Sequence, residues 1–478
     1  MIDYSKIGLK AGLEIHQQLD TNKLFCNCSS YLRSDEPDYL VTRKLHKVAG
    51  EAGEVDIAVE YEAARGKEFI YQGYNDSTCL VELDEEPPHQ INQHALDEAL
   101  KIALLLNCEI YPVTQIMRKT VIDGSNTCGF QRTFLIAHSG FIETSFGKVG
   151  IESVALEEDA ARIVSREDKK VTYRLDRLGI PLVEIGTRPQ LDSPEKIKEA
   201  ALKIGEILRA CKVKRGLGTI RQDLNISIKG HSRVEIKGFQ DPKMMIKTTD
   251  LEIKRQQEEI KKGKKEGEVR NAKDDGTTEF LRPLPGGFRM YPETDLELLK
   301  ISRDKINEIK KVLPRLRKEI KSELIKKGLT EELTDLVLEG NLDEFEVLMQ
   351  VYNKDANLVA KMVTLWRNEF ATKLKKSFDE IKAVLSERVL EHVLEKMTKG
   401  DVSEGDVKGI LWKVASGENL ESALKVEKVG HDVLEEEIVR IVKEKPGLRA
   451  NAYMGLVIAK IPHADKRKAM EILNRIVK

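Results

Sequence analysis

The period of the hydrophobic pattern changes near residue 300, and this change restricts the possible folds more than any other feature of the chain. Before it, short segments alternate apolar and polar residues and are separated by glycines and turn residues, as at 12–19, 221–228 and 234–239. A period of two is that of strands with one buried face. After it, apolar residues recur every three or four positions, which is the period of amphipathic helices. We therefore expect a strand-rich front and a helical remainder.

Two helices are expected to interrupt the front strands. One follows Asn92, and the other has Ser193 as its N-cap and Pro194 in its first turn. The apolar face of the second helix is expected to bury Ile197, Ala201, Ile204 and Leu208. With these helices among the strands, the front of the chain is predicted to be α+β.

Domain boundaries follow from the same pattern. With 478 residues, the chain is longer than one hydrophobic core usually serves. The polar stretch TKLKKS at 372–377 breaks the helical pattern, so we predict three domains at 1–298, 299–375 and 376–478. A run of Lys, Glu and Gly at 258–268 is interpreted as a solvated helix end or a loop.

Composition and missing motifs exclude several classes of protein. The sequence has no run of about 18 apolar residues that would span a membrane and no secretion signal at its start, so a cytoplasmic location is expected. The six cysteines are too scattered for a disulfide scaffold. The sequence also lacks the GxxxxGK(S/T) phosphate loop, a GxGxxG after a strand, HExxH and the serine hydrolase elbow.

Polar residues share one face on two of the predicted strands. In GLEIHQQL the period of two puts Glu14 and His16 on the same face. In RQDLNISI the same period aligns Arg221, Asp223 and Asn225. A solvated sheet face is the alternative for either strand taken alone. Together, the two strands predict a site that combines carboxylates, an imidazole and a guanidinium.

Further charged residues accompany these faces. Glu184 lies in the otherwise apolar strand IPLVEI, where a buried carboxylate must be paired or bound to a cation. Glu157, Glu158 and Asp159 in LEEDAAR form either a helix start or a metal-binding edge. The basic residues considered with them are Arg118, Lys119, Arg132 and Arg221. Carboxylates that hold Mg²⁺ and arginines that hold phosphates favour magnesium-dependent phosphate chemistry.

Three cysteines resemble part of a metal site. Cys26, Cys28 and Cys79 supply three thiols where a structural zinc needs four ligands. Because a second cysteine pair is missing, free thiols near a turn are the preferred interpretation.

Seven long strings along residues 7–295 resemble the B/E family of tRNA-dependent amidotransferases and occur in the family's order. They are GLEIHQQLDTNKLFCNCSS, TCLVELDEEPPH, MRKTVIDGSNTCGFQRT, LEEDAARI, RLDRLGIPLVEI, KRGLGTIRQDLNISI and EVRNAKDDGTTEFLRPLPGGFRMYPETD. Within the family, DGSNTCGFQRT and LRPLPGGFRMYPETD are similar to the archaeal E type rather than to the bacterial B type. The helical remainder resembles the family's helical and tail domains more loosely.

The resemblance implies a fold and an activity. The implied fold is a cradle-like catalytic domain with a mostly antiparallel sheet, followed by a helical domain and a small helical tail domain that binds tRNA. The implied enzyme is a ligase that uses ATP and Mg²⁺ to phosphorylate the side-chain carboxylate of glutamate on Glu-tRNA(Gln). Ammonia from an asparaginase-like partner of the family's D type then displaces the phosphate, so a hetero-oligomer is implied.

The resemblance also assigns residues position by position. The family's catalytic and magnesium-binding residues correspond to Glu14, His16, Glu158 and Glu184. The positions near the nucleotide correspond to Arg118, Lys119, Arg132, Arg221, Asp223 and Asn225. In one respect the chain departs from the E type, whose members usually carry an inserted domain resembling part of aspartyl-tRNA synthetase ahead of EVRNAKDDG. Here a short charged segment fills that place.

Two other functions and the mode of tRNA binding stay open. A B-type protein acting on Asp-tRNA(Asn) or Glu-tRNA(Gln) would perform the same chemistry. A protein whose catalytic domain is inactive would only bind tRNA. Because the net charge is −1, a local basic patch would have to hold a polyanion. Residues 440–478 carry ten Lys or Arg against three Asp or Glu, so we expect phosphate contacts there. The alternative is an ordinary solvated helix face.

Overall fold

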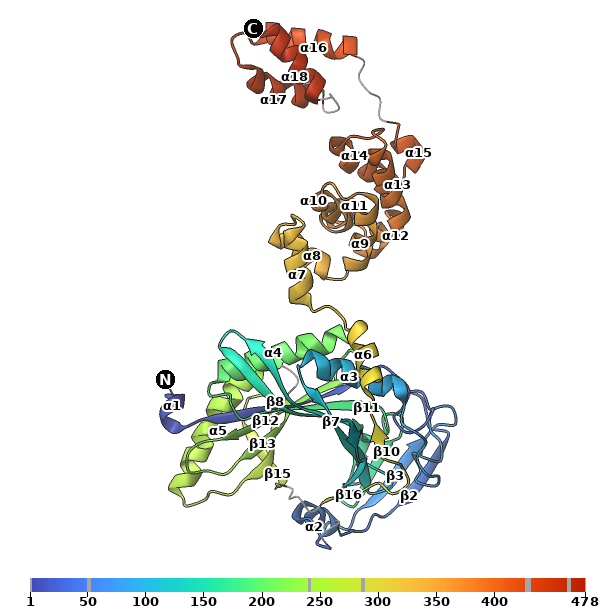
Figure 1. Cartoon of the computed structure of the whole chain (residues 1–478), viewed down its shortest axis with the longest axis vertical. Coiled ribbons are helices and arrows are strands. Elements are labelled where there is room, and N and C mark those ends of the chain that lie inside the picture. The colour runs from blue at the N-terminus through green and yellow to red at the C-terminus, as the bar shows by residue number, and fades with distance from the viewer. Residues whose placement is uncertain are drawn as a thin grey trace. The chain divides into compact units, whose positions relative to one another are not determined.

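The computed structural model describes residues 2–49, 53–239, 242–284, 289–425, 431–461 and 466–477. The chain folds into two compact units, Met1–Leu316 and Arg317–Lys478 (Figure 1). No helix among the described residues combines the length and the apolar character that crossing a membrane requires.

A large sheet forms the centre of the first unit. Its strands run in the spatial order β15 (Thr278–Pro283), β14 (Glu268–Ala272), β13 (Val234–Phe239), β12 (Ile220–Ser227), β1 (Lys10–Gln18), β11 (Pro181–Thr187), β8 (Gly147–Glu158), β7 (Phe130–Thr144), β6 (Met117–Thr120) and β16 (Met290–Pro292). The short β4 (Glu109–Ile110) also pairs with β7. Only β13 and β14 run parallel, so the predicted α+β class with a mostly antiparallel sheet is confirmed.

A smaller sheet lies in the same unit. It has the order β2 (Tyr39–Arg43), β3 (Glu68–Gly73), β10 (Lys170–Arg174) and β9 (Arg162–Arg166), and only β3 and β10 are parallel. Phe69, Tyr71 and Tyr173 anchor its own apolar core. A third pairing joins β5 (Val113–Thr114) to β17 (Leu299–Lys300).

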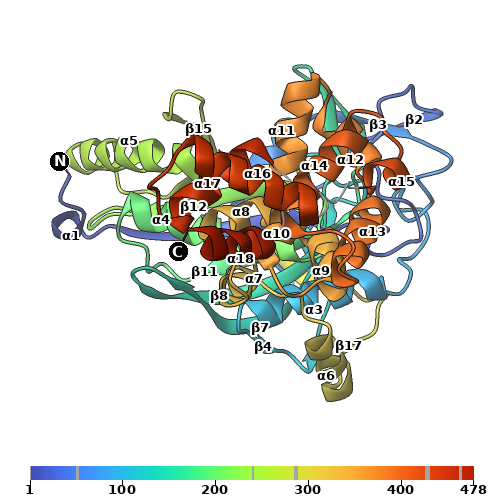
Figure 2. The same cartoon turned by 90° about the horizontal axis from the view of Figure 1, so that it is seen from above.

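Three long helices pack on one face of the large sheet. They are α3 (Gln93–Leu105), α4 (Pro194–Ala210) and α5 (Pro242–Lys261), and α4 lies beside α5 (Figure 1 and Figure 2). Both predicted helices are confirmed, with Asn92 capping α3 and Ser193 capping α4. The sequence interpretation missed α5, because only its polar end at 258–268 was singled out. The shorter helices of this unit are α1 (Tyr4–Ile7), α2 (Ile57–Ala63) and α6 (Arg303–Lys311).

The position of the main core determines which sheet face is open to a ligand. Leu13 and Ile15 of β1 are buried in the core that these helices form with the sheet. Because neighbouring residues of a strand point to opposite faces, Glu14 and His16 lie on the face without α3, α4 and α5.

The second unit is helical throughout its described elements, as predicted. They are α7 (Arg317–Lys326), α8 (Glu331–Leu338), α9 (Leu342–Val351), α10 (Ala356–Val363), α11 (Leu365–Leu374), α12 (Phe378–Val384), α13 (Glu387–Thr398), α14 (Glu404–Ala415), α15 (Leu420–Ala423), α16 (His431–Glu444), α17 (Ala450–Lys460) and α18 (Lys466–Ile476). One apolar core extends from Leu324 to Ala423, and a separate one joins α16, α17 and α18. The first of these cores continues across residue 375, and the three-domain division stays a prediction.

Candidate active site

Four adjacent strands of the large sheet carry the polar residues predicted from the sequence. In the register of β12, β1 and β11, His16 lies between Arg221 and Glu184. Glu14 pairs with Asp223 one step further along the same face. Residues paired across antiparallel strands point to the same side, so strands distant in sequence deliver their side chains to one place.

His16 is the centre of a cluster of carboxylates. Its Nε2 lies 3.3 Å from Glu184 Oε2, 3.6 Å from Glu14 Oε1 and 3.6 Å from Glu157 Oε1. Lys119 Nζ lies 2.9 Å from Glu157 Oε2 and 3.7 Å from Glu184 Oε2. Three carboxylates and two nitrogen groups therefore meet within contact distance on the open sheet face.

The charges of this cluster perturb one another. Burial alone would lower the pKa of His16, but the contact with Glu184 and the charges of Glu157 and Glu14 raise that pKa to about 9. Burial, with the neighbouring charge of Glu184, raises the pKa of Glu14. Burial would also raise the pKa of Glu184, yet Lys119 and His16 hold it below its usual range. At neutral pH, without a bound cation, His16 is protonated and Glu184 is ionised.

The donor atoms fit a divalent cation. Glu14, His16 and Asp223 form one group whose ligand atoms lie within 4.8 Å of one another, and His16, Glu157 and Glu184 form a second. Carboxylate oxygens are the donors that Mg²⁺ prefers. Two groups that share His16 could thus each hold a divalent cation.

A second set of charged residues extends the same face. Lys237 Nζ lies 2.6 Å from Asp223 Oδ2 and 2.5 Å from Glu235 Oε1. Burial would lower the pKa of Lys237, but these two carboxylates and Glu14 raise it. Oδ1 of Asn225 is buried and has no hydrogen-bond partner among the described residues. Asp223 and Asn225 thus lie on the predicted face. The carboxylate of Asp223 is already engaged in an ion pair with Lys237.

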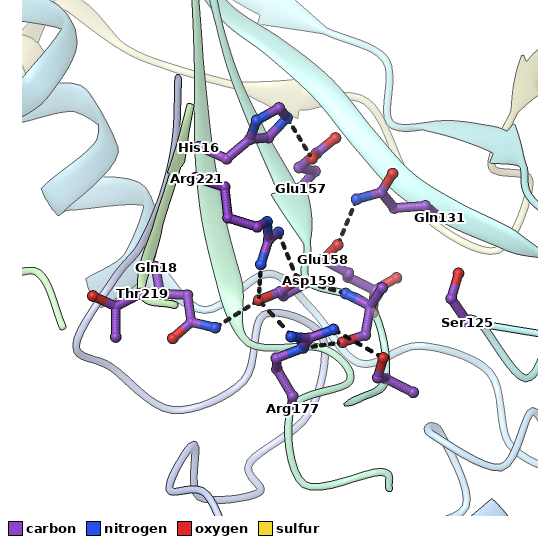
Figure 3. Close-up of polar contacts among 12 residues, drawn as sticks. His16, Gln18, Ser125, Gln131, Glu157, Glu158, Asp159, Arg177, Thr219 and Arg221 are labelled. Carbon is purple, nitrogen blue, oxygen red and sulfur yellow. Dashed lines mark hydrogen bonds and ion pairs between the residues drawn. The ribbon is translucent and has the colours of Figure 1, made fainter. Parts of the chain in front are cut away.

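A basic hollow adjoins the cluster. It has a volume of about 410 Å³, and its wall includes Arg177, Arg221, Lys237, Arg282 and Arg289. Arg221 connects the two places, because it pairs in register with His16 and also lines the hollow. Figure 3 shows Arg221 between His16 and the acidic Asp159, with Arg177 on the other side of Asp159. A cavity of this size and charge suits the phosphates of a nucleotide.

Three predicted site residues lie elsewhere. Glu158 follows Glu157 in β8 and faces the opposite side of the sheet, where its Oε2 lies 3.3 Å from Arg132 Nη1. Arg132 also donates to Glu293 Oε2 at 2.8 Å, and Arg118 donates to Glu293 Oε1 at 2.5 Å. Glu158 therefore does not converge with Glu14, His16 and Glu184 in this structure, because the period of two separates neighbouring residues of a strand. The assignment of Arg118 and Arg132 to the nucleotide stays a prediction.

The structure adds Glu157 and Arg177 to the residues assigned to the site from the sequence. Glu157 is the member of the LEEDAAR carboxylates that contacts His16, and it is almost fully buried. The side of the sheet to which Glu157 points depends on the register of β8 against β7 and β11, and the sequence does not provide this register. Arg177 lies in the turn between β10 and β11, where no periodicity marks it.

Comparison with known proteins shows the family. Residues 9–307, more than half of the chain, match the protein family described as the GatB/GatE catalytic domain. The chain belongs to the GatB/GatE family.

Several family members are similar to this chain along most of their length. The E subunit of the glutamyl-tRNA(Gln) amidotransferase of Methanocaldococcus jannaschii is 37% identical over 638 positions, which span 100% of this chain and 99% of that protein. The E subunit of Saccharolobus solfataricus is 33% identical, and the comparison covers 100% of this chain and 99% of that protein. That of Methanothermobacter thermautotrophicus is 37% identical over 76% of this chain and 80% of its own. These relatives confirm the resemblance to the E type.

The lengths of these proteins differ in one respect. The 638 compared positions of the M. jannaschii protein exceed the 478 residues of this chain by 160, so at least that many positions have no counterpart here. This difference agrees with the expected lack of an inserted domain. The predicted place of the missing domain is the short segment between α5 and β14.

The three cysteines of the possible metal site meet a fourth donor. Cys26, Cys28, Cys79 and Glu82 place one ligand atom each within 4.8 Å of the others, and the thiols are not in disulfides. Glu82 is also paired with the buried Lys23 at 2.7 Å. The sequence interpretation considered cysteines alone, so it missed the carboxylate that completes a set of four donors.

Proposed function

We propose that this chain converts Glu-tRNA(Gln) to Gln-tRNA(Gln), using ATP, Mg²⁺ and ammonia from an asparaginase-like partner of the D type. The observation that carries the proposal is the His16 cluster beside a basic hollow, in a chain that belongs to the GatB/GatE family. The name shared by the similar archaeal proteins favours the E type over the B type. A cytoplasmic location belongs to the same proposal.

The first step joins two anions. A side-chain carboxylate oxygen of the glutamyl group attacks the γ-phosphorus of ATP, the bond to the β-phosphate oxygen breaks, and ADP leaves. Mg²⁺ held by Glu14, His16, Glu157 and Glu184 would supply positive charge where the two anions meet. Arg221 and Lys237 lie between this cluster and the hollow, so they are placed to bind the phosphates.

The second step forms the amide. Ammonia attacks the activated carbonyl carbon, the bond to the phosphate oxygen breaks, and inorganic phosphate leaves. The attacking nitrogen loses a proton as the amide forms.

Reconstitution tests the proposal. The purified chain is supplied with Glu-tRNA(Gln), ATP, Mg²⁺ and ammonium chloride, so that external ammonia replaces the partner, and the amino acid is released from the tRNA and identified. We expect glutamine that depends on ATP and on the misacylated tRNA. Unchanged glutamate, with the tRNA bound, would indicate a binding protein. Glutamine formed only when an amidase pair is added would indicate a protein of the B type.

A further inference from the structure

Asp159 is a buried carboxylate that joins three separate segments next to the active site. Its side chain is fully buried at the end of β8. Oδ2 accepts a hydrogen bond from Gln18 Nε2 of β1 at 2.6 Å, and Oδ1 accepts one from Arg221 Nη2 of β12 at 2.9 Å. Arg221 Nη1 makes a second, longer contact at 3.3 Å, and Arg177 Nε lies 3.9 Å from Oδ2. Figure 3 shows Asp159 surrounded by these three side chains.

Asp159 allows two guanidinium groups to lie near each other. Arg177 and Arg221 carry the same charge and repel, and both side chains are only partly exposed to water. Two partly buried like charges are stabilised by an anion between them, because repulsion would otherwise separate them. The two arginines hold the pKa of Asp159 below its usual range although burial would raise it. The carboxylate is thus ionised and available to both arginines.

The arginines keep donors for a ligand. Arg177 donates Nε to Ala160 O at 2.7 Å and Nη2 to Ala161 O at 2.9 Å, which fixes the plane of its guanidinium. Among the described residues, its Nη1 and the Nε of Arg221 have no hydrogen-bond partner. Both arginines and Asp159 line the hollow of about 410 Å³. The pair is therefore oriented from behind and open toward the hollow.

We propose that Asp159 is a positioning residue that holds Arg177 and Arg221 side by side as a clamp for the polyphosphate of ATP. This inference rests on the proposed function and adds to it the residue that orients the clamp and Arg177 as its second half. Asp159 is not expected to touch the nucleotide, since its side chain is fully buried and its oxygens already accept hydrogen bonds from Gln18 and Arg221. It fixes the positions of the two guanidinium groups before the nucleotide binds. Donors that are already fixed bind a phosphate chain at a smaller entropic cost.

The test uses Asp159→Asn, which keeps the shape of the side chain and removes its charge. Binding of ATP and of inorganic tripolyphosphate is measured by calorimetry, and amidation kinetics give KM and kcat. We expect both ligands to bind about tenfold or more weakly, and KM for ATP to rise with kcat within about threefold. Glu344→Gln is the matched control, because it removes the carboxylate of a buried arginine pair in the second unit, with Arg367 at 2.6 Å. This control should lower the melting temperature without changing ligand binding.

A second variant keeps the inference testable if Asp159→Asn does not fold. Arg177→Met should weaken tripolyphosphate binding by a similar factor. In the double variant the two losses should be less than multiplicative, because Asp159 acts through Arg177. Normal tripolyphosphate binding by either single variant overturns the inference, and so does a fall in kcat at unchanged KM. If the wild-type chain binds ATP and makes no Gln-tRNA, only the proposed function fails, whereas a wild-type chain that binds no ATP refutes both.

Discussion

The neighbouring residues Glu157 and Glu158 provide the sharpest test of which sheet face is catalytic. Both are buried carboxylates at the end of β8, yet Glu157 faces His16 and Lys119 while Glu158 faces Arg132. Replacing each with glutamine keeps the shape and removes one charge. The two variants therefore differ only in the face of the sheet that loses its anion.

The expected magnitude follows from the contacts of Glu157. Its carboxylate lies 2.9 Å from Lys119 Nζ and 3.6 Å from His16 Nε2, and only 2% of its side chain is exposed. Removing one partner of a buried ion pair costs about 3–5 kcal/mol. If about 3–4 kcal/mol of this is lost from the transition state, kcat falls by about 10²–10³-fold.

Glu158→Gln should behave differently. Arg132 keeps Glu293 at 2.8 Å, so its charge is still paired after the substitution. We expect the free energy of unfolding to fall by about 1–3 kcal/mol and kcat to stay within about threefold of the wild type. The assay is single-turnover formation of Gln-tRNA at saturating ATP, with thermal unfolding in parallel. A large loss of kcat in Glu158→Gln with near-normal activity in Glu157→Gln would refute the assignment of the faces.

Three further changes have defined outcomes. Glu184→Gln should abolish phosphorylation of the glutamyl group and leave tRNA affinity nearly intact, since the amide lacks the charge that a cation needs; amidation at the normal rate would reduce Glu184 to a structural acid. Removing residues 426–478 should weaken tRNA binding and flatten the dependence of log affinity on log salt, because α16, α17 and α18 have a core of their own that can be removed as a unit; an unchanged slope would place the tRNA contacts elsewhere. Without Mg²⁺, the pKa of His16 is raised to about 9, so its ion pairs stabilise the fold fully below the ordinary pKa near 6.5 and lose this contribution as pH rises through about 9. Wild-type protein should therefore lose up to about 3 kcal/mol more than His16→Gln between pH 7 and 10, and parallel unfolding curves of the two proteins would contradict this.

The local features of the front domain could be predicted because they depend on neighbours in sequence. The alternation in 12–19 and 221–228 places Glu14, His16, Arg221 and Asp223 on polar faces, and the structure pairs β1 with β12 in a register that unites them. The helix after Ser193 was predictable for a similar reason, since its cap and its apolar stripe lie within one segment.

The remaining features depend on contacts between distant segments. The choice between Glu157 and Glu158 requires the register of β8, because a shift of one residue exchanges the two faces. Arg118 and Arg132 have a basic character that suits phosphate, but Glu293, more than 150 positions away in sequence, pairs with both. Tertiary pairing decides such roles, and the composition of a segment does not reveal it.

The tail domain shows the same limit for charge. Residues 440–478 carry a basic excess, but Arg440 contacts Glu437 and Glu444, and Arg475 contacts Glu435. Glu435 and Glu437 lie in α16 outside 440–478, so they offset part of the excess on the exposed surface of the tail. The tail as the tRNA-binding domain stays a prediction that the salt dependence tests.

In the proposed reaction, the glutamyl carboxylate is phosphorylated before ammonia attacks it. Isotope transfer measures this directly: Glu-tRNA(Gln) is prepared with ¹⁸O in both side-chain carboxylate oxygens and is amidated with ATP and ammonium chloride. The phosphate released is then analysed by mass spectrometry. We expect each phosphate released with glutamine formation to carry one ¹⁸O, because the oxygen that attacked phosphorus leaves with it. Unlabelled phosphate accompanied by normal Gln-tRNA formation would contradict the account.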